Sequence, residues 1–227
     1  VGREKFEQGY RLACHYKVDG PLTIEVPDSS LFQSGLKILS HDACGQIDVE
    51  KGGVPGQRFG VAFDIGTTTL VGTLVDMATG ADLAVSSAVN PQTSYGDDVV
   101  SRIKKCRDDR AGLHLLNDTI RKAVNSIISR LLKQAGVDKN AVCQIACAGN
   151  TTMQAILCNI DPSPLGEIPF TPTVLDPVRM KAADMKLHVN PDADVFVFPN
   201  VGGFVGGDTV AGITATRLDQ QKEPSLL

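Results

Sequence analysis

The feature that most constrains the fold is a group of three short apolar segments between residues 59 and 89. They read FGVAFDIG at 59–66, TTTLVGTLVDMATG at 67–80 and ADLAVSSAV at 81–89. Short apolar segments bounded by turn residues are typical of β-strands, and closely spaced strands pair as hairpins. The sequence therefore predicts three consecutive strands joined by hairpin turns.

Helices and strands alternate after this meander. Residues 96–107 begin with acidic and end with basic side chains, the order that suits a helix macrodipole. Between residues 111 and 136 apolar residues recur every three or four positions, which predicts a long helix that Gly136 ends. The remaining predicted elements are a buried strand at 141–148, a helix that begins near Thr151 or Thr152, a proline-rich irregular segment at 161–177, a buried strand at 195–198 and a helix at 206–218.

Composition limits the class of protein. The chain has 227 residues, of which 42% are hydrophobic and 21% charged, as expected for one large globular domain or a domain with an appendage. The net charge of −4 provides no positive field for nucleic acid. No apolar stretch reaches the roughly 18 residues of a membrane span, and the first twenty residues lack the apolar core of a signal peptide. We therefore expect a cytoplasmic protein with neither membrane nor nucleic-acid partners.

A candidate anion site lies between the first two predicted strands. Asp64 precedes a turn at Gly66, and a glycine turn lets backbone N–H groups and hydroxyls face one point, as in loops that hold phosphate oxygens. The hydroxyls belong to Thr67, Thr68 and Thr69. Asp64 is placed to hold Mg²⁺ through water, because magnesium keeps part of its hydration shell. A plain β-turn with exposed threonines is the alternative.

Two further groups of residues stand at predicted helix starts and can face the same cleft. A helix start offers free N–H groups, but asparagine, threonine and aspartate are also ordinary helix caps, and both interpretations stay open. Asp97 and Asp98 likewise either complement a helix dipole or contribute to function. The cleft candidates are Gly149, Asn150, Thr151 and Thr152, together with Gly207 and Asp208, whose carboxylate would orient a water or the metal.

Several sequence blocks resemble one family. Residues 60–80 (GVAFDIGTTTLVGTLVDMATG) resemble the first phosphate loop of the superfamily of acetate and sugar kinases, Hsp70 and actin. More narrowly, four blocks are similar to the reductive activators of corrinoid proteins, which join a ferredoxin-like module to an actin-like ATPase domain. These blocks are NPQTSYGDDVVSRI, ACAGNTTM, DPSPLGEIPF and PNVGGFVGGDTVAG.

The resemblance implies a fold and a domain order. Residues 59–227 would form an α/β lobe of the actin-like, ribonuclease H-like class, with a mixed sheet flanked by helices. Residues 28–58 would be a linker, and residues 1–27 the C-terminal remnant of a [2Fe-2S] ferredoxin-like module in which Cys14 is a cluster ligand. Such a cluster needs four cysteines, and none precedes Cys14. Either the start of the module is missing, as the initial Val1 suggests, or Cys14 is a small buried residue.

The resemblance also implies an activity. ATP with Mg²⁺ would drive the transfer of one electron from a [2Fe-2S] cluster, if the upstream module is present, to the Co(II) form of a corrinoid protein. The family's second lobe and its adenine-binding residues are expected to be absent from this chain, which alone should show no ATPase activity. The alternatives are a small-molecule kinase of the same superfamily and a non-catalytic iron-sulfur or docking protein. A homodimer is compatible with the family, and the sequence does not decide the oligomeric state.

Overall fold

The computed structural model describes Gly20 and residues 58–220. The predicted ferredoxin-like remnant at 1–27 and linker at 28–58 therefore lie outside the described residues, apart from Gly20 and Arg58, and so does Cys14.

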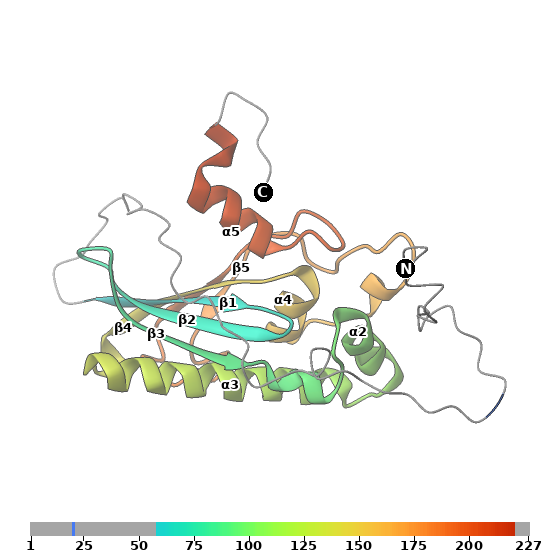
Figure 1. The fold of residues 1–227 in the computed structure, drawn as a ribbon, viewed down its shortest axis with the longest axis horizontal. Helices are drawn as coiled ribbons and strands as arrows, with labels where there is room; N and C mark the ends of the chain where they lie inside the picture. The colour runs from blue at the N-terminus through green and yellow to red at the C-terminus, as the bar shows by residue number, and fades with distance from the viewer. Residues whose placement is uncertain (1–19, 21–57, 221–227) are drawn as a thin grey trace, which may run out of the picture. The chain divides into compact units, whose positions relative to one another are not determined.

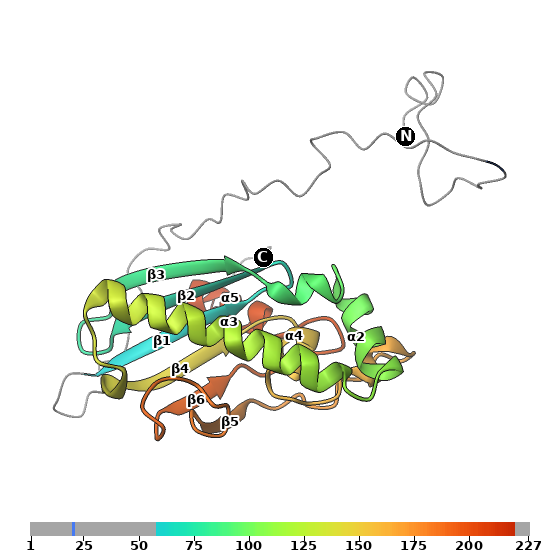
Figure 2. The ribbon, with the colours of Figure 1, turned by 90° about the horizontal axis from the view of Figure 1, so that it is seen from below.

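A six-stranded mixed sheet forms the centre of the described region, with the strand order β3-β2-β1-β4-β6-β5 (Figure 2). The three strands of the meander were predicted, and they pair in antiparallel fashion. The strands β4 and β6 were also predicted, and the structure adds that β4 pairs parallel with β1 and β6 pairs parallel with β4. The antiparallel edge strand β5 was not predicted. The strands are β1 (Phe59–Ile65), β2 (Thr69–Asp76), β3 (Ala81–Val89), β4 (Val142–Ala148), β5 (Val178–Lys181) and β6 (Asp194–Val197).

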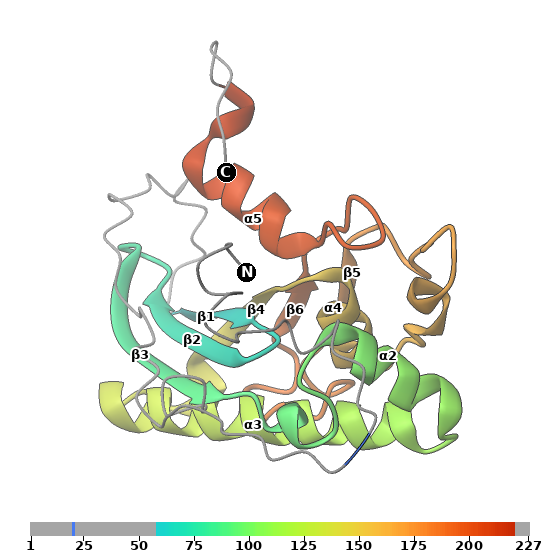
Figure 3. The same cartoon turned by 45° about the vertical axis from the view of Figure 1, so that its right-hand side comes forward.

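Helices lie on both sides of this sheet. In Figures 1 and 3, α3 lies below it, α5 lies above it and α2 lies beyond its right-hand end. The α-helices are α2 (Val99–Asp108), α3 (Gly112–Ala135), α4 (Thr151–Leu157) and α5 (Gly207–Thr216). Short 3-10 helices are η3 (Pro91–Ser94), η4 (Lys139–Ala141), η5 (Ser163–Gly166) and η6 (Leu218–Gln220). The predicted helix at 96–107 begins only at Val99, because the Asp98 side chain caps it by accepting from the Ser101 N–H at 2.7 Å.

The main core lies between the sheet and α3. Most of the apolar stripe of α3 is buried, with Leu113 and Leu132 only partly so, in agreement with the three- and four-residue spacing of the sequence. Side chains alternate along β1, so Val61, Phe63 and Ile65 enter this core, whereas Ala62 and Asp64 are exposed. Asp64 thereby emerges on the sheet face opposite α3.

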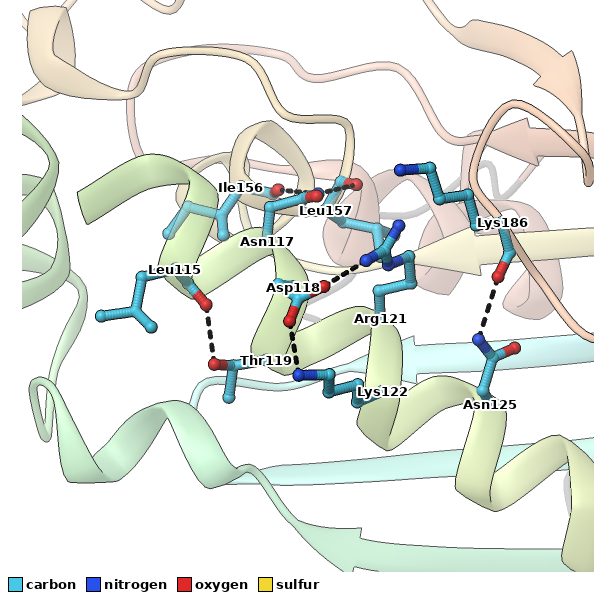
Figure 4. A network of polar contacts seen from close by, with 10 residues as sticks. All are labelled: Leu115, Asn117, Asp118, Thr119, Arg121, Lys122, Asn125, Ile156, Leu157 and Lys186. Carbon is cyan, nitrogen blue, oxygen red and sulfur yellow. Dashed lines mark hydrogen bonds and ion pairs between the residues drawn. The ribbon is translucent and has the colours of Figure 1, made fainter. Parts of the chain in front are cut away.

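Two asparagines fasten the polar side of α3 to neighbouring segments (Figure 4). Asn117 Nδ2 donates to the carbonyl oxygens of Ile156 and Leu157, both at 2.9 Å, and so satisfies acceptors at the end of α4. Asn125 Nδ2 donates to the Lys186 carbonyl at 3.0 Å. The ion pairs drawn in the same figure join residues within α3. The asparagines therefore fix α3 to the end of α4 and to the segment between β5 and β6.

None of the helices between residues 58 and 220 combines the length and the apolar character needed to cross a membrane.

Candidate functional site

The predicted phosphate loop is the turn between β1 and β2. A Cβ atom on Gly66 would lie only 2.3 Å from the carbonyl oxygen of Thr69, so no other residue fits this bend without displacing the backbone. Gly66 and the three threonines that follow it are each partly exposed. The glycine that the sequence singled out is thus required by a close approach of two backbone segments.

Two buried polar residues hold the carbonyl groups of this loop. Asn90, which has no exposed surface, donates from its backbone N–H to the Thr68 carbonyl and from Nδ2 to the Gly66 carbonyl, both at 2.8 Å. Arg102, equally buried, donates from Nη2 to the Thr67 carbonyl at 2.7 Å. Three successive carbonyl oxygens are therefore held by a scaffold under the loop.

This arrangement orients the N–H groups of the loop. In a trans peptide the N–H points opposite to the carbonyl of the preceding residue, and the peptide bonds of the loop are trans. The N–H groups of Thr67 and Thr69 therefore point away from their neighbours' contacts with Asn90, and the Thr68 N–H points away from Arg102. Within residues 58–220 neither the Thr67 nor the Thr68 N–H has a backbone acceptor. Successive N–H groups of a turn that have no acceptor within the protein are suited to an anion.

The turn between β4 and α4 lies beside this loop. Asn150 Oδ1 accepts from the Met153 N–H at 3.0 Å and caps α4, while its Nδ2 donates to Thr67 Oγ1 at 2.9 Å. The helix cap is therefore present, and the same amide also contacts the loop. The Thr151 and Thr152 side chains are instead buried, and Thr151 Oγ1 donates to the Gly202 carbonyl at 2.9 Å. Their hydroxyls face the protein interior.

The start of α5 packs against the same turn. The Asp208 N–H donates to the Gly149 carbonyl at 3.1 Å, and the Gly207 N–H donates to Gln154 Oε1 at 3.0 Å. A Cβ atom on Gly206 would lie 2.5 Å from the Thr151 nitrogen, so glycine is needed where α5 approaches α4. These contacts place Asp208 over the ends of β1 and β4.

Asp64 and Asp208 line one hollow of about 600 Å³ between the sheet and α5. Much of the remaining lining is small, which keeps the hollow open, and residues 66–69 do not contribute to it. The alanines concerned are Ala62, Ala146, Ala148, Ala211 and Ala215. Asp64 is exposed to solvent through this hollow, although the surrounding protein still desolvates it. This partial burial, followed by repulsion from the Asp208 carboxylate, raises the pKa of Asp64.

Asp64, which is partly desolvated and lies near a second carboxylate, is suited to a cation. Within the described ranges, no three or more His, Cys, Asp or Glu side chains gather in a metal-binding group. A hydrated Mg²⁺ ion does not require one, because it commonly uses one or two carboxylates, water and the phosphates of a substrate. The donor set therefore fits magnesium that is held together with a phosphate ligand.

The described cysteines are packing residues. Burial raises the pKa of Cys106 to about 11 and that of Cys158 to about 12, so both thiols are protonated at neutral pH. Cys147 is fully buried, and burial raises its pKa as well. All four described cysteines are free thiols.

Sequence reasoning missed the scaffold under the loop. Asn90 and Arg102 both belong to the block NPQTSYGDDVVSRI, of which only Asp97 and Asp98 had been considered for function. Asp98 caps α2 and Asp97 is exposed, so neither reaches the loop through the described contacts. The available signal was Arg102 itself, which precedes the buried Ile103 on the inner face of α2.

The fold places the described region in a known class of protein. A three-stranded meander continued by parallel strands, with helices on both sheet faces, defines a lobe of the actin-like, ribonuclease H-like class. A solved structure described as "Reductive activator for corrinoid,iron-sulfur protein" matches with a TM-score of 0.73 and 37% identity, over 76% of this chain and 27% of that one.

The chain belongs to the family described as "RACo middle region", whose model matches residues 59–221. A curated relative, the corrinoid activation enzyme RamQ of Eubacterium limosum, is 31% identical over 224 residues. The match covers 92% of this chain and 38% of that relative, so the chain spans well under half of the relative's length.

Proposed function

We propose that this chain is the first lobe of an ATP-dependent reductive activator of corrinoid proteins. Family membership and the names of the two relatives support this assignment. One structural observation supports nucleotide binding: Asn90 and Arg102 hold the three carbonyl groups of residues 66–68. The N–H groups of the loop, next to Asp64, are thereby turned away from these contacts.

In this proposal the loop and the hollow bind different parts of one ligand. The N–H groups of Thr67, Thr68 and Thr69 bind phosphate oxygens of ATP, and the threonine side chains border them. Asp64 and Asp208 hold the water shell of Mg²⁺, whose charge offsets the burial and the repulsion from Asp208 that raise the pKa of Asp64. The second lobe of the complete protein would close on the nucleotide from the other side and hold adenine.

The redox part of the proposal concerns the complete protein. A [2Fe-2S] cluster, when bound, supplies the electron that reduces Co(II) to Co(I) in the partner corrinoid protein, and Cys14 is a candidate ligand. The Co(II)/Co(I) couple has a very low potential, so the transfer needs an energy input. Closure of two lobes on ATP provides a two-state element whose equilibrium the nucleotide can shift. A cytoplasmic location is part of the same proposal.

The test uses the complete reading frame, expressed and purified without oxygen. With a chemical reductant that keeps the cluster reduced, the protein is expected to hydrolyse ATP and to pass one electron to a corrinoid protein, from Co(II) to Co(I), only when ATP and Mg²⁺ are present, as followed by the absorbance of the corrinoid. Asp64→Asn should abolish the ATP-dependent reduction, whereas Asp97→Asn, which removes an exposed carboxylate outside the hollow, should not. Corrinoid reduction that needs no ATP would refute the proposal, and phosphorylation of a small molecule would favour the kinase alternative.

A further inference from the structure

Arg102 is a buried cation with an unusual set of partners. Its Nη2 donates to the Thr67 carbonyl at 2.7 Å and its Nε to the Gly96 carbonyl at 3.0 Å. Its Nη1 donates to Gln92 Oε1 at 3.1 Å and approaches Met153 Sδ at 3.0 Å. All four partners are neutral. A buried charge is ordinarily paired with an opposite charge, because desolvation of an isolated ion is costly.

Among residues 58–220, no acid neutralises this guanidinium by direct contact. Asp97 and Asp98 attract it through space, but both are exposed, and the Asp98 carboxylate accepts the N–H and hydroxyl of Ser101. Burial lowers the pKa of Arg102, and these two carboxylates act in the opposite direction. An arginine nevertheless stays protonated in proteins. A positive charge therefore remains under the loop in the absence of a ligand.

The position of Arg102 couples this charge to the loop geometry. By holding the Thr67 carbonyl, the guanidinium turns the Thr68 N–H to the opposite side of the peptide. The same side chain reaches Met153 in the first turn of α4, where Asn150 contacts Thr67 Oγ1. Arg102 thus lies where the loop, η3 and the start of α4 meet, and its interactions do not occupy the outward face of the loop.

We propose that Arg102 is a positioning residue whose buried charge is balanced by the phosphates of a nucleotide bound on the opposite side of the loop. This inference rests on the proposed function and deepens it, since it assigns the preference of the site for ligands of high negative charge. Arg102 touches the loop backbone and not the ligand, so its influence acts through the Thr67–Thr68 peptide and through the field of the guanidinium. Inside a protein such a field is much less screened than in water.

The test compares affinities for ATP, ADP and AMP, each with Mg²⁺, measured by calorimetry on the complete protein. Arg102→Gln removes the charge but keeps a hydrogen-bond donor, and it should weaken ATP binding by at least about tenfold, ADP binding less and AMP binding least. Arg102→Lys keeps the charge and should retain the wild-type ratio of ATP to AMP affinity. Lys104→Gln removes an exposed charge from the same helix and should change each affinity by less than about twofold, because solvent screens it.

The outcomes separate this inference from the function on which it rests. If the wild-type protein binds nucleotides but Arg102→Gln weakens all three equally, or none, the charge has no role and the inference is wrong while the nucleotide site stands. If the wild-type protein binds none of them, the proposed function fails and the inference fails with it. Circular dichroism checks folding. If Arg102→Gln does not fold, Arg102→Lys decides, since a fall in its ratio of ATP to AMP affinity overturns the inference.

Discussion

Asn150 Nδ2 donates a hydrogen bond to Thr67 Oγ1 at 2.9 Å, across 83 positions of sequence. The same side chain caps α4 through its oxygen atom, which accepts from the Met153 N–H. One amide therefore joins the two loops that the sequence had singled out independently. They meet because β1 and β4 are adjacent and parallel, so that both strands end at the same edge of the sheet.

Asn150→Asp should separate the two roles of this amide. Aspartate keeps an oxygen that accepts the Met153 N–H, so the free energy of unfolding should stay within about 0.5 kcal/mol of wild type. It lacks the donor to Thr67, so MgATP should bind more weakly. Asn150→Ala loses both interactions and should cost about 1 kcal/mol of stability in addition. Urea unfolding and nucleotide titration measure the two effects. Equal losses of stability in both variants would show that the cap contributes nothing.

The sequence predicted those parts of the site that depend on local patterns. The short apolar segments predicted β1 and β2, and the glycine between them predicted the turn that follows Asp64. The scaffold under the loop could not be found in this way. Arg102 bonds to Thr67 across 35 positions, and a single buried polar residue in an amphipathic helix leaves no periodic signal.

The unpredicted strand β5 has a related explanation. It is only four residues long, two of them are exposed, and it follows the proline-rich segment, so its sequence gives little evidence of a strand. It forms because the β6 edge offers backbone partners, with Val178 opposite Val197 and Lys181 opposite Asp194. The Lys181 Nζ then pairs with the Asp194 carboxylate at 2.6 Å. Such pairing is a property of the assembled sheet and not of the segment.

Gly66→Ala should destabilise the protein and disrupt the loop. The new Cβ would lie 2.3 Å from the Thr69 carbonyl oxygen, and a backbone contact of this kind can be relieved only by moving the turn. We expect a loss of about 1–3 kcal/mol in the free energy of unfolding together with loss of MgATP binding. Gly202→Ala is the matched control, because a Cβ there meets nothing within 4 Å. If the two substitutions had the same small effect on urea unfolding, the tight turn would not constrain the site.

The raised pKa of Asp64 predicts a particular dependence of stability on pH. The folded protein binds this proton more tightly than the unfolded chain, whose value is near 3.8, so ionisation of Asp64 opposes folding. Its contribution to stability should fall as the pH rises from about 3.8 through the higher pKa of the folded state. Asp64→Asn should remove this decrease and raise the melting temperature at pH 7 in the absence of Mg²⁺.

Thermal unfolding of wild type and Asp64→Asn between pH 3.5 and 7 isolates this contribution, because the other carboxylates are common to both proteins. Asp208→Asn provides an intermediate case, since it removes the repulsion but leaves Asp64 partly buried. Addition of Mg²⁺ with ATP should stabilise wild type more than Asp64→Asn. A difference between the proteins that grew as the pH fell below 3.8 would have the wrong sign.

Asn117 should contribute more to stability than the ion pairs beside it on α3. Its amide serves two carbonyl oxygens at the end of α4, a helix of only seven residues that would not persist without tertiary contacts. Asn117→Ala leaves both acceptors without this donor and should cost about 1–3 kcal/mol. Asp118→Asn breaks the ion pairs with Arg121 and Lys122, but Asp118 is itself more than a third exposed, so it should cost less than about 1 kcal/mol.

Because α4 also carries Asn150 at its start, Asn117→Ala should in addition weaken MgATP binding, whereas Asp118→Asn should leave that binding unchanged. Urea unfolding and nucleotide titration of the two variants test this order, and a larger loss for Asp118→Asn would contradict it.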